Sequence, residues 1–467
     1  MIPLAELLTQ SELFGTLGTT SRDDLPPKSI SQQDDAVRTK ICKALIKLKD
    51  KRAIPFLRSR RELNESFVLE ALGKLGDVDS LPVLLRQLKS ETHDDRLAAA
   101  KALQGTPDPR AIAPLAEALK PATGGWFTNR NVSSKSQLAR ELSLALAATF
   151  EPEAAEILVS YLRNSSLDMW ESFDGDWYQP PLAEAAARHP HGYAIVRMSS
   201  VAIPSLVKEL QLPHKRAAPP PNADGAPVQS VSTQTSREVS AWALGQLAFE
   251  SDIPTSDFAA AESALIAALK SSEPGLQLHA ARTLGRLKSN ASLPTLMELV
   301  EACASKTKDV TDQHLGAKFS TRQAFTSQGN QSLNAKQLRD SVDLLVATVN
   351  ALSWLGTNSS VHQLEALLSH GVADVREAAI YGIVSGGHEN AAELVVPMLK
   401  DSASKVRTTA ARQLGFLGEA ESVLPLLKLL ETEARRPKPV PPKNRNGILV
   451  FNSSQPDARF AVMSMAA

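Results

Sequence analysis

Apolar residues recur along the chain with the spacing of helices that bury one side. The clearest segment covers residues 405–430. Its first half places apolar residues at steps of four, four and three, namely Val406, Ala410, Leu414 and Leu417. This spacing predicts one buried stripe on a first helix. Gly415 and Gly418 are expected to end that helix, because glycine is common just past a last helical turn.

A second helix is predicted directly after this turn. Pro425 stands early in it, where a missing amide hydrogen costs little. Its buried side is expected to consist of Leu426, Leu427 and Leu430. Such a helix pair cannot cover its own apolar faces, so consecutive pairs are expected to stack into a solenoid.

The same pattern returns elsewhere in the chain. The segment AARQLG at 410–415 recurs as AARTLG at 280–285, and LGFLG at 414–418 recurs as LGKLG at 72–76. Five markers of the last copy are Arg407, Ala410, Ala411, Leu414 and Pro425. The same mutual spacings hold for Arg96, Ala99, Ala100, Leu103 and Pro114. Repetition at this scale is typical of solenoid proteins.

The recurring pattern, VR..AA..LG.lg......P.L, resembles HEAT-like repeats, in particular the short bacterial type also found in phycobilisome lyases. The resemblance implies an all-α fold, an alpha-alpha superhelix of about ten helix pairs with several loop insertions. We expect the solenoid at 34–433, after an amino-terminal segment at 1–33 and before a proline-rich basic tail at 434–467. The resemblance implies no particular activity, because such repeats occur in scaffolds, adaptors, lyase subunits and enzymes alike.

Four stretches interrupt the repeat and are expected to be inserted loops, at 121–135, 164–181, 213–234 and 304–335. The second combines large rings with carboxylates and is the most distinctive candidate for recognition of a partner. The candidate partner-binding residues are Trp170, Phe173, Trp177, Tyr178, Asp174 and Asp176. The alternative is a loop that folds back over a repeat edge and buries its rings there.

One arginine recurs in the first helix of the repeats, at Arg38, Arg96, Arg237, Arg376 and Arg407. A ladder of guanidinium groups could hold acidic partners or phosphates. The resemblance to HEAT repeats favours a structural role instead, in which each arginine bonds acidic groups of the neighbouring repeat and carbonyl groups of turns. We therefore expect these arginines to fix the stacking of repeats.

Composition narrows the classes of function. Lys plus Arg total 51, as do Asp plus Glu, so no overall charge favours nucleic acid or an anionic membrane. Cys42 and Cys303 are far apart, which supports neither a disulfide framework nor a thiolate zinc site. We expect no secretion signal and no membrane span, and a cytoplasmic location.

No cofactor, metal or catalytic residue is predicted. The motif His189-Pro190-His191 has no third ligand nearby, and proline restrains its geometry. The HEAT-repeat enzyme deoxyhypusine hydroxylase uses several His-Glu doublets, whereas this chain has His388-Glu389 alone. Phosphate-loop, dinucleotide-binding, zincin and nucleophile-elbow motifs are missing.

The leading hypothesis is a non-enzymatic scaffold or adaptor that binds a protein or peptide in the solenoid groove and along the inserted loops. A bilin lyase or lyase-like subunit is the alternative, and it depends on the resemblance alone. A nucleic-acid-binding solenoid is weaker, because the net charge is zero. In the tail, the apolar segment GILVF at 447–451 could pair as a short strand or dock on the last repeat.

Overall fold

The computed structural model describes residues 39–60, 66–123, 132–162, 190–212, 236–250, 253–315, 329–356 and 361–435. Within these ranges every regular element is a helix, which confirms the predicted all-α class. The chain divides into two compact units, residues 1–209 with 214–239 and residues 210–213 with 240–467. None of the described helices is long and apolar enough to cross a bilayer.

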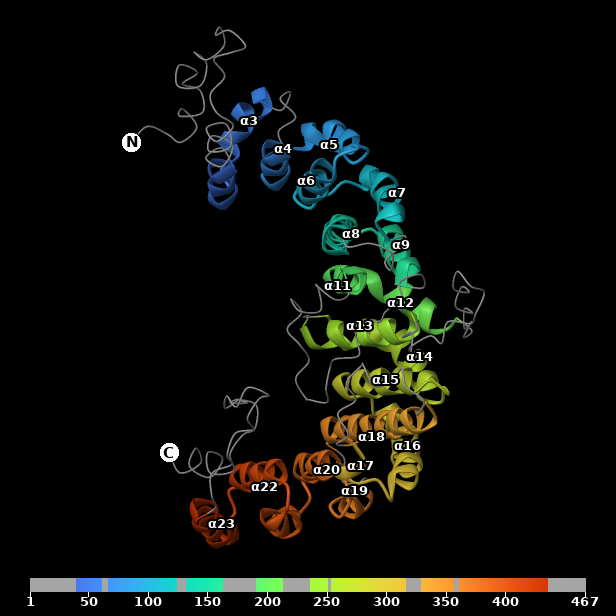
Figure 1. The fold of residues 1–467 in the computed structure, drawn as a ribbon, viewed down its shortest axis with the longest axis vertical. Coiled ribbons are helices and arrows are strands. Elements are labelled where there is room, and N and C mark those ends of the chain that lie inside the picture. Colours follow the sequence, from blue (N-terminus) through green and yellow to red (C-terminus); the bar gives the residue numbers. More distant parts are fainter. Residues whose placement is uncertain are drawn as a thin grey trace. The chain divides into compact units, whose positions relative to one another are not determined.

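The first unit contains five described helix pairs (Figure 1). They are residues 39–48 with η2 (Lys51–Ala53) and α3 (Ile54–Arg60), α4 (Ser66–Lys74) with η4 (Val78–Ser80) and α5 (Leu81–Gln87), α6 (His93–Leu103) with η5 (Pro109–Ala111) and α7 (Ile112–Thr123), α8 (Val132–Ala147) with α9 (Pro152–Leu162), and α11 (Pro190–Arg197) with η6 (Ser199–Ala202) and α12 (Ile203–Leu210). First helices α4, α6, α8 and α11 pack on one another in chain order. Each of α5, α7 and α9 also packs on the first helix of the next pair, as stacking of repeats requires.

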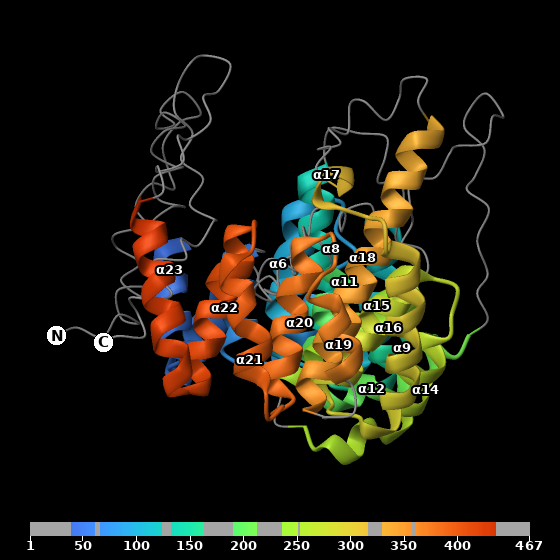
Figure 2. The ribbon, with the colours of Figure 1, turned by 90° about the horizontal axis from the view of Figure 1, so that it is seen from below.

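The second unit repeats this arrangement with five further pairs. They are α13 (Ser236–Glu250) with η7 (Thr255–Phe258) and α14 (Ala259–Leu269), α15 (Pro274–Arg286) with η8 (Asn290–Ser292) and α16 (Leu293–Thr307), α18 (Gly329–Leu355) with α19 (Val361–Leu367), α20 (Ala373–Ser385) with α21 (Ala391–Val395) and η10 (Val396–Lys400), and α22 (Ser404–Leu417) with η11 (Ala420–Ser422) and α23 (Val423–Arg435). The short helix α17 (Asp312–Leu315) precedes α18. Helices α15, α18, α20 and α22 pack in that order and run side by side (Figures 1 and 2).

The predicted apolar stripe of the last repeat is mostly buried. Val406, Ala410 and Leu414 are closed to solvent, and Leu417 is half-buried. The small residues of the repeat pattern are buried as well, at Ala99, Ala100, Ala280, Ala281, Ala410 and Ala411. Small side chains at these positions let neighbouring first helices approach closely.

Gly415 does not end the first helix, contrary to the prediction. Helix α22 continues to Leu417, and Gly418 follows as its cap in the left-handed region, at φ 69°. In other repeats the glycine of the Leu-Gly motif serves close packing instead. A Cβ atom on Gly73 of α4 would lie 2.4 Å from Cα of Ala102 in α6, so only glycine fits between these helices.

The buried side of α23 also differs from the prediction. Leu427 is half-exposed, whereas Leu429 is buried and Leu426 and Leu430 are partly buried. Helix α23 packs against η10 of the preceding pair and η11 of its own, and Glu433 bonds Arg407 of α22, so these contacts decide which side is buried. The leucine pattern alone could not define that side, because five of the first eight residues of this helix are leucines.

Two predicted insertions are shorter than expected. Residues 121–123 belong to α7 and 132–135 to α8, while α16 includes 304–307 and α18 includes 329–335. The residues that extend these helices are mostly small or polar, so they lie outside the apolar pattern that predicts the ends of the repeats. The predicted insertions at 164–181 and 213–234 lie outside the described residues, as do the amino-terminal segment 1–33 and the tail from 436 onward.

Candidate protein-binding surfaces of the second unit

The recurrent arginine reaches back to the turn before its own helix. Arg96 Nη1 donates to the carbonyl oxygens of Ser90 at 2.6 Å and Glu91 at 3.1 Å. Arg376 Nη1 donates to the carbonyl of His370 at 2.7 Å. Arg407 repeats the geometry, with Nη1 at 2.8 Å from the Asp401 carbonyl and 3.0 Å from that of Ser402. Each guanidinium therefore ties a turn to the helix that follows it.

Two of these arginines also bind buried carboxylates. Arg376 of α20 forms a bidentate ion pair with Asp401, which stands just before α22 of the next pair. Arg407 Nε donates to Glu433 of α23 at 2.8 Å, and both side chains are buried. Arg237 is half-buried in α13, and Arg38 lies outside the described residues. Because Arg376 and Arg407 are buried and paired, they are unavailable to a phosphate or an acidic partner at the surface.

The six candidate residues of the aromatic-acidic insertion, Trp170, Phe173, Trp177, Tyr178, Asp174 and Asp176, lie outside the described residues. Candidate binding surfaces in the described part of the chain come from other residues. Two such surfaces occur in the second unit, one beside α19 and one at the ends of α13, α15 and α18.

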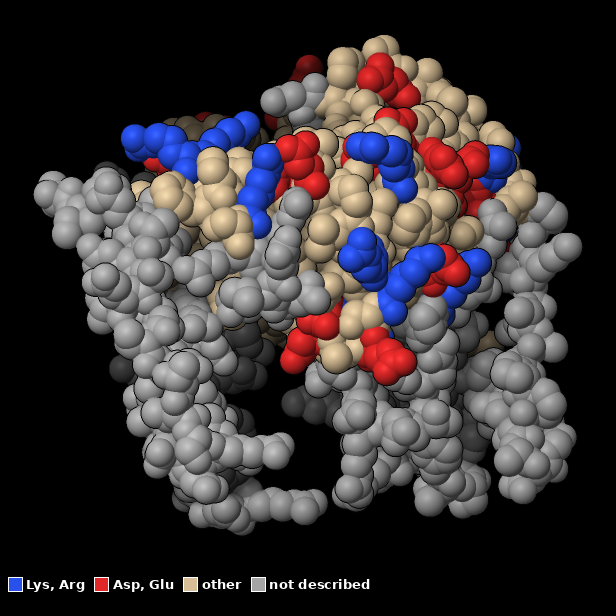
Figure 3. All heavy atoms as spheres, turned by 90° about the horizontal axis from the view of Figure 1, so that it is seen from above, with Lys and Arg blue, Asp and Glu red and all other residues tan. Residues whose placement is uncertain are grey.

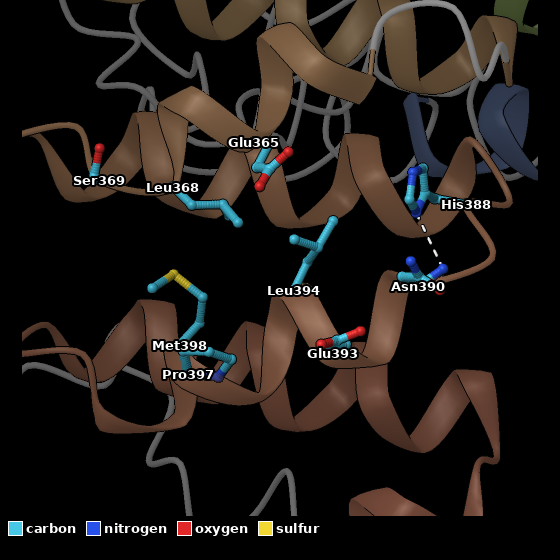
Figure 4. A pocket seen from close by; sticks show the side chains of 9 residues that line it. All are labelled: Glu365, Leu368, Ser369, His388, Asn390, Glu393, Leu394, Pro397 and Met398. Carbon is cyan, nitrogen blue, oxygen red and sulfur yellow. Dashed lines mark hydrogen bonds between the residues drawn. The ribbon is translucent and has the colours of Figure 1, made fainter.

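The first surface is an open groove of about 590 Å³ beside α19, α21 and η10. Its lining residues are Glu365, Leu368, Ser369, His388, Asn390, Glu393, Leu394, Pro397 and Met398. Figure 4 shows Leu368 on one side and Leu394 and Met398 on the other, pointing toward the space between them. The groove thus has an apolar centre that is open to solvent.

Carboxylates stand on both sides of this centre. Glu365 comes from α19 and Glu393 from α21, and both are exposed (Figure 4). At one end the imidazole of His388 accepts a hydrogen bond at Nδ1 from the backbone amide of Asn390, at 3.1 Å. An apolar centre between carboxylates suits a protein segment that presents an aliphatic side chain beside Lys or Arg.

The second surface is a cluster of two rings and a guanidinium at the carboxyl-terminal ends of first helices. The Arg286 Cζ atom of α15 lies 5.2 Å from the ring centre of Phe249 and 5.9 Å from that of Trp354. Arg286 Nη1 also donates to the carbonyl of Gly245 at 2.7 Å, which anchors the guanidinium on α13. The Phe249 ring is 71 % exposed and Trp354 is 41 % exposed. Exposed rings held by a cation offer large contact area at low entropy cost.

The described histidine of the His189-Pro190-His191 motif packs inside the first unit. His191 is buried, its ring stacks on Tyr161, and its Nδ1 lies 2.9 Å from the hydroxyl of Ser143. Burial lowers the pKa of His191 from 6.5 to about 4. His189 lies outside the described residues. In the part of the chain that the structure describes, no group of three or more His, Cys, Asp or Glu side chains is placed to hold a metal ion.

Charges of both signs lie intermingled on the surface that Figure 3 shows. Lys and Arg side chains there stand beside Asp and Glu side chains, and no broad field of one sign covers the drawn part of this face. A nucleic-acid interface usually needs a continuous basic track along the phosphate backbone. The charge distribution on this face therefore gives no support to the hypothesis of a nucleic-acid-binding solenoid.

Neither described surface was predicted from the sequence. The groove combines residues of two helix pairs, and Leu394 and Met398 look like ordinary members of an apolar stripe. The ring cluster had a detectable signal at Trp354, which occupies the position that Lys74 fills in α4. A large ring just beyond the end of a stripe favours an exposed position.

Comparisons with known proteins agree with this architecture. HEAT repeats match residues 228–311 and 361–437, and a PBS lyase HEAT-like repeat matches residues 95–121. The chain therefore contains HEAT-like repeats in both units, as its repeat pattern predicted. No curated protein sequence matches it.

Two solved structures show similarity at low scores. One is the complex of CpcE and CpcF of phycocyanin lyase from Nostoc sp. PCC7120, with a TM-score of 0.32 and 19% identity over 63% of this chain and 97% of that chain. The other is an engineered protein, with a TM-score of 0.32 and 14% identity over 94% of this chain and 96% of that chain.

Proposed function

We propose that the chain is a non-enzymatic interaction scaffold that binds a protein or peptide in the groove beside α19 and α21. The observation that carries the proposal is the apolar centre of this groove, open to solvent and flanked by the carboxylates of Glu365 and Glu393. A segment with Leu, Ile or Phe next to Lys or Arg would bury its aliphatic or aromatic group between Leu368 and Met398. Its cation would then pair with one of the two carboxylates.

Selection of peptides on the full chain tests this function. A phage library of random 12-residue peptides is expected to yield binders that combine an apolar residue with Lys or Arg. Binding of a selected peptide should weaken at least tenfold in the variant Glu365→Lys with Glu393→Lys, because attraction becomes repulsion. Replacing the Lys and Arg of that peptide by Glu should restore binding to the variant.

A matched control changes the net charge equally in the first unit, away from the residues that line the groove. Glu117 of α7 and Glu153 of α9 are exposed residues of the first unit. The variant Glu117→Lys with Glu153→Lys should bind the selected peptide like the unchanged chain. Peptides that bind both double variants equally, or a selection that yields no binder, would contradict the proposal.

The insertion at 164–181 is a second candidate element of the same scaffold. Its rings and carboxylates would favour a partner that carries Arg or Lys, through ion pairs and cation–π contacts. Trp170→Ala with Trp177→Ala is expected to weaken partner binding by at least ~2 kcal/mol and to change global stability by less than ~1 kcal/mol. Lost stability with intact binding would identify the rings as a local cover of a repeat edge.

A bilin lyase or lyase-like subunit is the alternative function, and the PBS lyase HEAT-like repeat at 95–121 is the observation that favours it. Co-expression with a phycobiliprotein and a bilin tests it directly. A covalent bilin adduct on a cysteine of the phycobiliprotein, detected by mass and absorbance, would support a lyase and would contradict a purely non-enzymatic scaffold.

A further inference from the structure

Helix α23, the last described helix, leaves apolar side chains in solvent. Val423 is 53% exposed, Leu424 is 68% exposed and Leu427 is 50% exposed. Leu427 lies three positions after Leu424 and four after Val423, so it neighbours both on the helix surface and joins the three into one apolar strip. Helix α23 packs against η10 and η11, and no later helix follows it in the described part of the chain. The strip therefore has no described neighbour to cover it.

Internal repeats show which positions of the second helix become buried when another pair follows. A buried serine precedes α5, α16 and α23 alike, namely Ser80, Ser292 and Ser422. Counted from that serine, Val423, Leu426 and Leu430 of α23 correspond to Leu81, Leu84 and Leu88 at α5, which are all buried. Leu424 and Leu427 correspond to Pro82, which is exposed, and Leu85, which is partly buried, so leucines at these two places make the last pair more apolar on its outside than α5. Helix α5 packs against α6 of the next pair. The last pair thus keeps the apolar residues of an internal repeat, although the end of a solenoid is expected to be polar.

The sequence directly after α23 supplies a candidate cover. Residues 448–451 are Ile, Leu, Val and Phe, a run of four large apolar side chains. Residues 436–446 separate this run from the helix, and extended they span about 35 Å. Helix α23 has 13 residues and is therefore about 20 Å long. The linker is long enough for the apolar run to reach any part of the strip, and its four prolines oppose continuation of the helix.

A second copy of the chain is a poorer occupant. A stable homodimer buries about 800 Å² on each partner. Three partly exposed aliphatic side chains on a 13-residue helix offer much less area than this. A tethered segment needs less, because the linker holds it near its site at high effective concentration.

We propose that residues 447–451 pack on the strip formed by Val423, Leu424 and Leu427 and so cap the last repeat. This contact is independent of the groove beside α19. It makes residues 447–451 a part of the repeat domain.

Hydrogen exchange of the full chain tests the cap. Leu449→Asp is expected to raise exchange of the amides of α23 at least tenfold, because the helix loses its cover. Val462→Asp places the same charge at another apolar tail position and should leave that exchange unchanged. Leu424→Asp should act like Leu449→Asp, and the two together should cause little further increase, since they remove the same contact.

Several results would overturn the cap. Unchanged exchange in Leu449→Asp would show that the segment does not cover the strip. Equal increases in α23 exchange in Leu449→Asp and Val462→Asp would show that the effect does not depend on residues 447–451. Analytical ultracentrifugation tests whether a second copy of the chain covers the strip instead. A dimer that Leu424→Asp converts to a monomer would assign the strip to a second copy. A monomer for both the unchanged chain and Leu424→Asp agrees with the cap.

Discussion

Arg376 and Asp401 join two consecutive helix pairs through a buried bidentate ion pair. Arg376 Nε lies 2.7 Å from Oδ2 of Asp401, and Nη2 lies 2.8 Å from Oδ1. The two side chains are 10% and 6% exposed. Asp401 also accepts from the amide of Ala403 at 2.7 Å, and its carbonyl accepts from Arg407. One aspartate therefore connects α20, the start of α22 and the arginine of the next repeat.

Asp401→Asn is expected to lower the free energy of unfolding by about 2–4 kcal/mol. Arg376 keeps its charge in a nearly closed site while it loses its ionised partner. Urea denaturation followed by circular dichroism measures the change.

An exposed pair supplies the control. Arg110 is 70% exposed and bonds Asp108 at 2.8 Å. Arg110→Met should change the free energy of unfolding by less than about 0.5 kcal/mol, since solvent screens such pairs. Equal losses of unfolding free energy in Asp401→Asn and Arg110→Met would show that burial of the Arg376–Asp401 pair does not increase its contribution to stability.

The helix pairs could be predicted because their signal is local. Steps of three and four between Val406, Ala410 and Leu414 define a buried stripe without knowledge of the neighbours. The partner of Arg376 is different, because Asp401 lies 25 residues away and meets it only after α20 and α22 have stacked. The resemblance to HEAT repeats implied such a partner without naming the residue.

The groove could not be predicted for a related reason. Glu365 and Glu393 belong to consecutive pairs, and neither has a pattern that separates it from other surface carboxylates. The exposure of Leu427 could not be predicted either, although it concerns a single helix. Its exposure depends on which side of α23 contacts η10, and a leucine-rich helix carries no mark of that choice.

Leu414→Ala is expected to destabilise the chain by about 2–5 kcal/mol. Leu414 is buried in α22, so truncation removes buried apolar contact and leaves a cavity. Thermal unfolding monitored by circular dichroism gives the shift. Phe416→Ala, two residues along the same helix, should have an effect below about 0.5 kcal/mol because that ring is 80% exposed. A melting temperature that Leu414→Ala leaves unchanged would show that the wrong side of α22 had been taken as buried.

Gly73→Ala is expected to destabilise the first unit by about 2 kcal/mol or more, by overpacking. In a solvent-exposed helix the same change would stabilise by about 1 kcal/mol, because alanine favours helix over glycine. Here the new Cβ would lie 2.3 Å from the carbonyl oxygen of Ala102, so α4 and α6 must move apart. Gly387→Ala tests backbone strain alone, since Gly387 has φ 67° and no atom near the new methyl group. Its cost should be smaller, about 1 kcal/mol. A stabilised Gly73→Ala variant would show that the two helices do not pack closely.

His191 is expected to make the first unit sensitive to mild acid. Burial lowers its pKa from 6.5 to about 4, so between these values the unfolded chain binds a proton that the folded chain excludes. The stabilising effect of a neutral His191 is fully present above pH ~6.5 and is lost as the pH falls toward 4, by at most ~1.4 kcal/mol per pH unit. His191→Gln, which does not titrate, should be less stable than the unchanged chain at pH 7 because it loses the stacking on Tyr161. Its deficit should shrink steadily as the pH falls from 6.5 to 4.5. Urea denaturation at half-unit pH steps measures both curves, and a constant difference between them would show that His191 is charged in the folded protein or that water reaches it.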